Sequence, residues 1–512
     1  MSPIIPSLLA SGLLLGPQQP AAPSVEAPLP ATAPVAAAEP VAAAERPALP
    51  TLTLAQAVAQ ALERNDQLLA AQDGVVRAEL GLKLARSAFH PKVVPNIFGS
   101  LGQTDITNQT YRVDVVQKLT TGTELRASVG TTTAQNQVGN YYNADTTLQL
   151  TQPLLRGFGR TVARRGLTSA EVRIADAYRQ RTLAQQQIVI QVATAYYQLV
   201  AQTELAAVAE LGLTRARRLV EASLAKMEIG KVSQLDVYRA QQLAAQSEAQ
   251  LLDAKGALED AREQLCFLMG HAPDAAFAVE SEIPRETETL DPATAVEVAL
   301  GHRLELETAQ AAVTEAERTA SYARNQLLPQ VDVNLALTRR EAVESFSASF
   351  GLNNYRFATF FAVSMPPDFT AQSIELQTAS LDRGQRRREL ETLKRRIADD
   401  TRHTLRQQER LVKSLELADA SVDFAQKEVE VADLRYQRGL SNNLDVVTAE
   451  NGLLQAQSRK LQAIAALAVA RLTLHATLGI LDPRAVAAAG PAPDTSKKID
   501  KTEEAPGSAG RK

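Results

Sequence analysis

The chain of 512 residues is short of several residue types, and each shortage weighs against a class of protein. It has no tryptophan and only 4% aromatic residues, a composition that favours long helices with shallow packing over a compact α/β enzyme. Its single cysteine, Cys266, rules out an intrachain disulfide and a cysteine-based zinc site. No run of 18 or more apolar residues occurs, so no membrane-spanning helix is predicted.

Charge and chemistry-bearing motifs are equally sparse. The net charge of −4 is too balanced to indicate a nucleic-acid-binding protein. The five histidines show no ligand spacing, and neither a Ser/His/Asp or Cys/His arrangement nor a glycine-rich phosphate loop occurs. We therefore expect no enzymatic activity, no cofactor and no bound metal.

The sequence does contain the same pattern twice. Residues 230–270 and 439–479 align without a gap at an offset of 209, with 14 of 41 positions identical. Residues 57–96 and 295–334 align at an offset of 238, with 15 of 40 positions identical. A duplication on this scale is typical of a protein built from repeated structural units, and it points to such a fold before it points to an enzyme.

The repeats divide the chain into five parts. These are a leader and Pro/Ala-rich linker (1–50), a first structural repeat (51–270), a connector (271–292), a second structural repeat (293–482) and a disordered tail (483–512). In the leader, Ile4 to Leu15 resembles the core of a signal peptide, but no Lys or Arg precedes it and Pro6 interrupts it. Three interpretations stay open: a working export signal, a weak or mis-started one, and no signal at all.

Each repeat is predicted to contain a helix, a β region, a very long helix, a tight turn and a returning helix. The predicted helices are 54–88 with a break near Asn65, 165–228 and 233–270 in the first repeat, and 295–328, 371–438 and 442–479 in the second. Gly230 and Gly439 end the very long helices, because glycine accepts the left-handed conformation of a tight turn. The two shorter helices of each repeat together nearly match the length of the long one, so we expect them to stack end to end against it.

A coiled-coil seam is predicted along the long helices. Apolar residues recur at alternating spacings of four and three, the period of a heptad repeat. In the second repeat the seam consists of Leu411, Leu415, Ala418, Val422, Ala425, Val429, Ala432 and Tyr436. The same register, shifted back by 209, gives Ala206, Ala209, Leu213, Ala216, Val220, Ser223 and Met227. The small residues among them predict closely approaching helices.

Between the helices the pattern changes to the period of two that is typical of strands. The candidates are 93–101, 112–119, 124–133 and 146–152 in the first repeat, and 331–337 and 357–364 in the second. The two alignment offsets differ by 29 residues, since 238 − 209 = 29, which gives the first repeat about one extra hairpin.

These strands fit either a half-buried soluble sheet or a membrane β-barrel. Alternation with aromatic residues near the strand ends is typical of the barrel. However, so few strands cannot close a membrane barrel by themselves, and open sheet edges are excluded from lipid. If the strands span a bilayer, several chains must share one barrel.

Taken together, these features resemble the TolC-like outer-membrane efflux channels over about residues 51–482. The resemblance is carried by the motif TQPLLRGFGR at Thr151–Arg160 and by the two turn motifs at Met227–Val237 and Tyr436–Val446. It implies a mainly α fold with a β-barrel portion, in which coiled-coil helices form a periplasmic tunnel. The strands of a homotrimer would then form one shared barrel in the lipid of the outer membrane.

The resemblance also implies a function and partners. The chain would be a passive exit duct of a tripartite efflux or type I secretion system, opened when it engages a periplasmic adaptor and an inner-membrane pump. The alternative for the whole chain is a soluble or periplasmic coiled-coil scaffold. The exported substrate, the identity of the pump and adaptor, and the place of the extra hairpin in the barrel are not evident from these patterns.

The same resemblance places candidate functional residues at the two turns. Asp236 and Asp445 would lie at the periplasmic aperture, where symmetry copies of a carboxylate attract cations. Tyr436 would tie the closed aperture, with Asp236 as its partner. The hairpin tips where the adaptor docks would be marked by Gly230, Leu235, Gly439 and Leu444.

The sequence departs from the family pattern at two positions, and the candidate residues also have simpler structural interpretations. Ser441 replaces an arginine that supplements the latch in the family, and Thr448 replaces a second acidic residue, so we expect a single ring and a weaker latch. Asp236 and Asp445 each open a helix after a turn and could be N-terminal caps alone. Tyr436 continues the heptad seam, so packing would also explain it.

Overall fold

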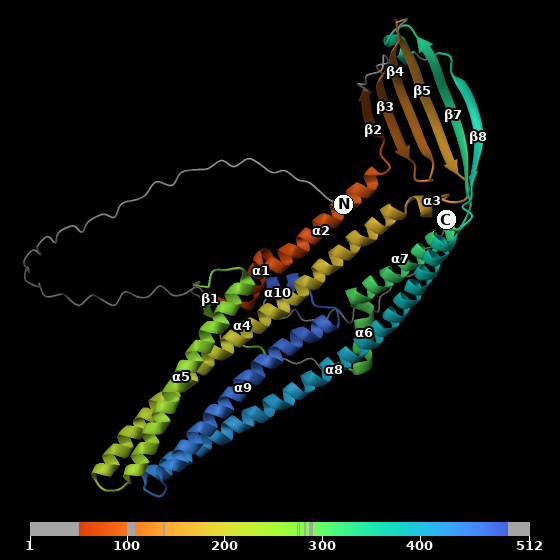
Figure 1. The fold of residues 1–512 in the computed structure, drawn as a ribbon. Coiled ribbons are helices and arrows are strands. Elements are labelled where there is room, and N and C mark those ends of the chain that lie inside the picture. The colour runs from red at the N-terminus through yellow and green to blue at the C-terminus, as the bar shows by residue number, and fades with distance from the viewer. Residues whose placement is uncertain are drawn as a thin grey trace, which may run out of the picture. The chain divides into compact units, whose positions relative to one another are not determined.

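The computed structural model describes most of the chain between residues 51 and 489. The described ranges are 51–99, 108–136, 139–273, 275, 277–280, 283–285, 290–351 and 353–489. The predicted leader and linker, and residues 490–512 of the predicted tail, lie outside these ranges. In Figure 1 the described residues form long helices connected to one six-stranded sheet.

Both repeats contain the predicted order of elements. The first repeat consists of α1 (Leu54–Arg64), α2 (Asp66–Ser87), β2 (Lys92–Gly99), β3 (Asn108–Lys118), β4 (Glu124–Asn136), β5 (Gly139–Pro153), α3 (Arg160–Ala163), α4 (Arg165–Glu228) and α5 (Gln234–Met269). The second consists of α6 (Pro292–His302), α7 (Leu304–Gln326), β7 (Gln330–Val343), the 3-10 helix η1 (Ser347–Phe350), β8 (Arg356–Ser364), α8 (Thr370–Gln437) and α9 (Asn443–Thr477). Two short strands, β1 (Thr51–Leu52) and β6 (Ala278–Val279), pair in parallel.

The helix boundaries follow local signals. The predicted break near Asn65 is confirmed, and the Asn65 side-chain oxygen accepts a hydrogen bond from the N–H of Gln67 at the start of α2. The second repeat breaks at the equivalent position, Arg303, which the sequence does not signal because arginine is not an N-cap residue. Asp291 caps α6 and Pro292 occupies its first turn, as is usual at helix starts.

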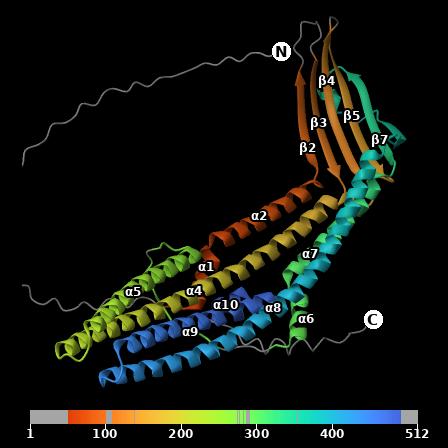
Figure 2. The ribbon, with the colours of Figure 1, turned by 60° about the horizontal axis from the view of Figure 1, so that its bottom comes forward.

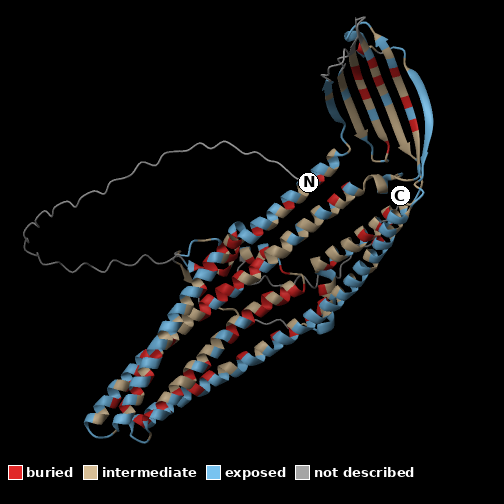
Figure 3. Ribbon diagram, in the orientation of Figure 1, coloured by how far each residue is buried: buried red, intermediate tan, exposed pale blue. Residues whose placement is uncertain are grey.

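Burial confirms the predicted coiled-coil seam. α4 packs against α5, and α8 packs against α9. The buried seam residues are Ala209, Leu213, Ala216 and Ser223 in α4, and Leu415, Val422, Ala425, Ala432 and Tyr436 in α8. In Figure 3 the buried residues of the helices lie mainly where neighbouring helices face each other. Across the described ranges, each helix is too short or too polar to be a membrane-spanning segment.

The stacking of two shorter helices against each long one is also confirmed. α2 and α5 both pack along α4, and α7 and α9 both pack along α8. At the joint of the first repeat, Asn65 Nδ2 donates to the carbonyl oxygen of Leu268 at 2.9 Å. At the joint of the second, Arg303 Nε donates to the carbonyl oxygen of Thr477 at 2.9 Å. Two different side chains therefore make the same contact at equivalent positions of the repeats.

A single sheet combines the strands of both repeats in the order β2-β3-β4-β5-β7-β8, with all neighbours antiparallel. The pairing of β5 with β7 joins the repeats. The first repeat supplies four strands and the second two, which confirms the extra hairpin and places it within the sheet. Among the described residues, β2 and β8 each have one unpaired edge. Figure 2 shows β2 at one edge of the sheet.

The sheet has two unlike faces, because alternate residues of a strand point to opposite sides. What we call the apolar face carries Val113, Val129, Leu148, Leu150, Leu335, Leu337, Phe357 and Phe361. What we call the polar face carries Arg112, Asp145, Thr147, Gln149, Asn334 and Arg340. On the polar face, Arg112 Nη2 lies 3.0 Å from Asp145 Oδ2, and Gln149 Nε2 donates to Asn334 Oδ1 at 3.0 Å.

The structure corrects the start of the predicted tail. Residues Pro483–Ala489 form a helix, α10, which packs on α1 and buries Val486. The Ala/Pro-rich composition suggested disorder, but the helix is held by a tertiary contact that composition does not encode. α10 also borders the largest apolar cluster, whose buried members include Val58, Ile188, Val192, Leu265, Leu472 and Val486.

Candidate functional site

Both coiled coils end in the same kind of turn. At the first tip, Gly230 has a φ of +69°, and the N–H that follows it donates to the carbonyl oxygen of Lys226 at 2.9 Å. At the second tip, Gly439 has a φ of +72°, and the N–H that follows it donates to the carbonyl oxygen of Arg435 at 2.9 Å. This is the Schellman motif, which needs a left-handed residue at the position of the glycine. Both glycines therefore end the long helices as predicted.

Asp236 caps the helix that leaves the first tip. Its Oδ2 accepts hydrogen bonds from Ser233 N at 3.1 Å and Ser233 Oγ at 2.8 Å, while Ser233 Oγ accepts from Asp236 N. These reciprocal bonds form a capping box at the start of α5. Asp236 Oδ1 also lies 3.8 Å from Arg239 Nη1. The Asp236 carboxylate is thus largely occupied by its own helix.

Asp445 holds the equivalent third position of α9, but its contacts differ. The side chain of Asn442 caps α9 by accepting from Leu444 N at 3.1 Å. Ser441 Oγ donates to Asp445 Oδ2, so this serine binds the carboxylate of its own hairpin. Thr448 Oγ1 donates to the carbonyl oxygen of Leu444 within the same helix. The Asp445 residue remains exposed.

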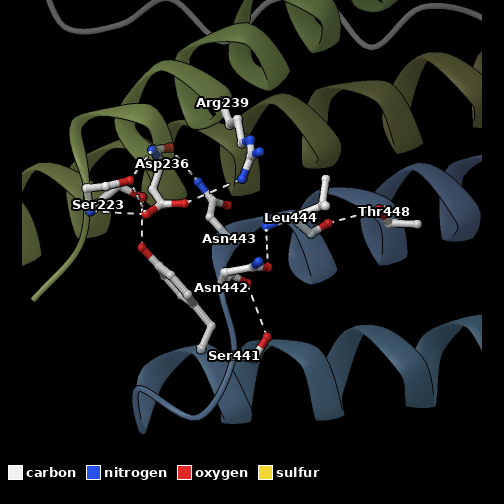
Figure 4. Close-up of polar contacts among 10 residues, drawn as sticks. Ser223, Asp236, Arg239, Ser441, Asn442, Asn443, Leu444 and Thr448 are labelled. Carbon is white, nitrogen blue, oxygen red and sulfur yellow. Dashed lines mark hydrogen bonds and ion pairs between the residues drawn. The ribbon is translucent and has the colours of Figure 1, made fainter.

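The two tips contact each other through Asn443. This residue is fully buried, and its Nδ2 donates to the backbone carbonyl oxygen of Asp236 at 2.8 Å. Figure 4 shows Asn443 reaching from α9 toward Asp236 at the start of α5. The contact uses the backbone of Asp236, so it does not depend on the charge of the carboxylate.

Tyr436 joins the two coiled coils at the same level, but its partner is not the predicted one. Its hydroxyl shares a hydrogen bond of 2.9 Å with Ser223 Oγ on α4, and both residues are buried. The prediction that Asp236 pairs with Tyr436 is therefore wrong for this structure. The physical reason is that the Asp236 carboxylate serves the capping box, while the Tyr436 ring follows the seam toward α4.

Lys226 completes this contact. Its Nζ donates to the carbonyl oxygen of Tyr436 at 2.6 Å and lies 3.5 Å from the centroid of the tyrosine ring. A cation at that distance is attracted to the ring face. Burial lowers the pKa of Lys226 below that of ordinary lysine, and the carboxylate of Asp433 partly offsets this effect.

Apolar side chains lie exposed around both tips. Leu235 is 55% exposed and Leu444 is 46% exposed, although each stands in the first turn of its helix. Ile229 and Leu440, which flank the two glycines, are more exposed still. The predicted docking residues therefore lie on an accessible apolar surface.

A cavity of about 550 Å³ lies between the four helices just above the tips. Its apolar wall includes Leu219, Leu243 and Leu453, and Lys226 and Tyr436 border it. Across it, Arg215 Nη1 lies 3.3 Å from Glu450 Oε2 and links α4 to α9. The described residues contain no cluster of His, Cys, Asp or Glu suited to a metal ion.

Sequence reasoning missed three residues of this site: Ser223, Lys226 and Asn443. One signal was present, because Ser223 is the only polar residue among the predicted seam positions of α4, and a buried hydroxyl in a seam needs a hydrogen-bond partner. Lys226 and Asn443 had no comparable signal, since their contacts depend on how the two coiled coils meet.

Comparisons with known proteins agree on the class. The family model for outer membrane efflux proteins matches residues 57–271 and 295–480. The chain is 22% identical over 415 residues to the outer membrane efflux protein BepC of Brucella suis biovar 1 (strain 1330), a match that covers 80% of this chain and 82% of that protein.

Two solved structures extend this similarity to the fold. The outer membrane protein VceC of Vibrio cholerae matches with a TM-score of 0.65 at 20% identity, covering 83% of this chain and 96% of that chain. The CmeC outer membrane channel of Campylobacter jejuni matches with a TM-score of 0.64 at 15% identity, covering 90% and 93%. Matches at these identities establish a mainly helical fold with a strand portion of the TolC-like kind.

Proposed function

Because the chain belongs to the outer membrane efflux protein family, we propose that it is the passive exit duct of a tripartite efflux or type I secretion system. It is an outer-membrane protein whose helical part lies in the periplasm, and its family consists of channels rather than enzymes. The proposal adds a homotrimeric assembly, an adaptor and a pump as partners, and a gate at the hairpin tips.

The open sheet supports the trimeric assembly. β2 and β8 each leave one edge without a partner among the described strands, and lipid excludes such edges. Three copies, with β2 of each pairing to β8 of the next, would close one barrel. The polar face would then line its interior, and the apolar face would contact lipid, as in other membrane barrels.

The tips are the proposed docking surface for the adaptor. Gly230 and Gly439 shape the turns, and the exposed Leu235 and Leu444 provide apolar anchors. Exposed apolar residues grouped in this way are typical of protein-binding sites. Engagement there would act directly on the contacts between the two coiled coils.

The gate would combine a latch and a charged ring. The latch is the contact of Tyr436 with Ser223 and Lys226, which holds α8 against α4. The ring would consist of Asp236 and Asp445 from three copies, which would favour cations at the aperture. Asp445 is the better candidate, since it is exposed while Asp236 is engaged in its capping box.

The observation that carries the proposal is a six-stranded sheet with two open edges, continuous with the paired coiled coils of an efflux-family chain. The test is to fractionate the membranes of expressing cells and to measure conductance of the purified protein in planar bilayers. A heat-resistant oligomer in the outer membrane that conducts ions is expected. A soluble protein without conductance would favour the scaffold alternative.

A further inference from the structure

Arg339 is an unexpected residue on the apolar face of the sheet. It follows Leu335 and Leu337 at alternate positions of β7, and it lies opposite Thr146 of β5. On this face its neighbours along β7 are Leu337 and Glu341, and the apolar residues that would meet lipid continue from Leu337 toward the start of the strand. A charged arginine facing hydrocarbon is unfavourable. Arg339 is nevertheless only 2% exposed, so something covers it.

The cover is the segment that follows β7, residues 344–351, which we call the folded-back loop. Arg339 Nη1 donates to the carbonyl oxygens of Ser349 at 3.1 Å and Gly351 at 2.8 Å. Arg339 Nη2 donates to the carbonyl oxygen of Ala348 at 3.2 Å and also contacts Glu341 Oε2. The guanidinium is thus satisfied by loop carbonyls and one carboxylate.

A second contact anchors the folded-back loop to the middle of the sheet. Ser349 Oγ and Thr131 Oγ1 share a hydrogen bond of 3.0 Å, and both residues are buried. Thr131 lies on β4 and on the same face as Arg339. The loop therefore covers the upper part of the apolar face instead of projecting from the end of the sheet.

The outer surface of this loop is aromatic. The ring of Phe346 meets those of Tyr111, Tyr142 and Phe350 edge to face, with centroid separations of 5.8, 6.2 and 5.4 Å. Phe346 is 45% exposed and Phe350 is 44% exposed, so both rings are available to a partner. Aromatic residues of this kind gather where a membrane protein crosses from hydrocarbon to headgroups.

The position of the loop fits the same boundary. The helices join the sheet at the start of β2, the end of β5, the start of β7 and the end of β8. The end of β7 at Val343 therefore lies at the opposite end of the sheet, away from the periplasmic helices (Figure 1). Below the loop, the exposed side chains of Leu148, Leu335 and Phe361 continue the apolar face.

We propose that the folded-back loop is a lipid anchor that sets the outer limit of the hydrocarbon band. Phe346 and Phe350 contact lipid of the outer leaflet at the level between acyl chains and headgroups. Arg339 is a positioning residue, which holds the loop on the sheet without meeting lipid. This inference rests on the proposed placement of the sheet in the membrane, with its apolar face toward lipid.

The absence of tryptophan makes a direct test possible, because one introduced tryptophan is the only such fluorophore in the chain. The full chain carrying Phe346→Trp would be reconstituted into phosphatidylcholine vesicles with bromine on the acyl chains, either near the glycerol or near the methyl end. Phe361→Trp on the apolar face and Phe360→Trp on the polar face are the controls, since both residues are on β8 and are exposed.

We expect bromine near the glycerol to quench Phe346→Trp about twofold more than bromine near the methyl end, as for a residue at the interface. Phe361→Trp should be quenched by lipid and Phe360→Trp should not. Quenching of Phe361→Trp without quenching of Phe346→Trp would overturn the anchor and leave the proposed function intact. If, in addition, the emission of the unquenched Phe346→Trp were shifted to the blue, a second copy of the chain would be covering the loop. If lipid quenched neither Phe346→Trp nor Phe361→Trp, the result would contradict both the lipid anchor and the proposed placement of the sheet in the membrane.

The role of Arg339 has its own readout. Arg339→Ala in the Phe346→Trp background should release the loop, reduce its lipid quenching and raise its quenching by acrylamide, while Phe361→Trp stays unaffected by the same change. Arg339→Lys should restore little of the effect, because lysine cannot reach several carbonyls with one planar group. Unchanged quenching in Arg339→Ala would remove Arg339 from the proposal.

Discussion

The hydroxyl of Tyr436 and the Oγ of Ser223 share a hydrogen bond of 2.9 Å between the two coiled coils of the chain. Tyr436 is the penultimate residue of α8, and Ser223 lies near the end of α4, so the bond ties the second hairpin to the first near both tips. At the offset of 209 between the repeats, Tyr436 corresponds to Met227 and Ser223 corresponds to Ala432, so neither residue of the bond is repeated. The contact therefore arises from a difference between the repeats.

This bond gives the first prediction. Tyr436→Phe removes the hydroxyl but keeps the ring and its contact with Lys226. A hydrogen bond contributes about 1 kcal/mol net, which corresponds to about a fivefold shift toward separated tips. We expect a rise of that order in basal open probability in planar bilayers. Ser223→Ala should match it, and the double variant should add nothing further, because both changes remove one bond. If the two changes raised the open probability additively, or if Tyr436→Phe did not raise it, Tyr436 would have only a packing role in the seam.

Lys226 predicts a pH dependence of the tip. Burial lowers its pKa below the ordinary value of 10.5. Between the lowered pKa and 10.5, the separated tip binds the proton more strongly than the closed tip, so the closed tip gains stability as the pH rises through this window. Hydrogen exchange of tip amides, compared at each pH with Lys226→Met, should give rising relative protection. A ratio that stays flat across the window would contradict the assignment.

Two left-handed glycines, Gly479 at a helix joint and Gly230 at a hairpin tip, predict a matched pair of stability effects. Gly479 has a φ of +74°, and a Cβ there would lie 2.8 Å from the carbonyl oxygen of His302. Gly479→Ala should therefore destabilise the protein by more than the roughly 1–2 kcal/mol of a left-handed residue alone. Gly230→Ala is the control, since its φ is +69° and no atom lies within 4 Å of the added Cβ. Equal losses in thermal unfolding would show that the close approach at the joint is unimportant.

Substitutions of Asp236 and Asp445 distinguish a role in a charged ring from a role at the start of a helix. If both carboxylates face the aperture, Asp445→Asn should lower cation selectivity more than Asp236→Asn, because Asp236 is bound in its capping box. If both carboxylates serve only the starts of their helices, each change should leave selectivity unchanged. It should lower stability by about 0.3–1 kcal/mol, because a negative charge in the first turn interacts favourably with the helix dipole. Reversal potentials in a salt gradient, measured beside thermal stability, distinguish these outcomes.

Much of the fold could be predicted because its signals are local and repeated. The heptad seam, the glycines at the turns and the strand periodicity each mark an element directly, and the duplication confirmed their order. The sequence did not predict the break at Arg303 or the helix α10, and the reason is the same for the two features. Both depend on contacts with distant segments, which no local pattern reports.

The sequence predicted where the candidate site residues lie in the fold, but not which hydrogen bonds they form. The positions of Asp236, Asp445 and Tyr436 near the tips followed from the turns and the resemblance. The pairing of Tyr436 with Ser223 could not follow, because it depends on the relative rotation of two coiled coils. The folded-back loop was equally hidden, since the burial of Arg339 is visible only once β7 lies beside β5.

The central claim is that copies of this chain close one barrel through the free edges of β2 and β8. Cysteine cross-linking tests it most directly, in a background where Cys266→Ala removes the single native thiol. One cysteine at Asn96 on β2 would be combined in turn with cysteines along β8, and outer-membrane fractions would be oxidised. We predict a covalent trimer for one narrow register, resistant to heat until reduced. Monomers alone at every position, or open-ended polymers without a trimer, would contradict the shared barrel.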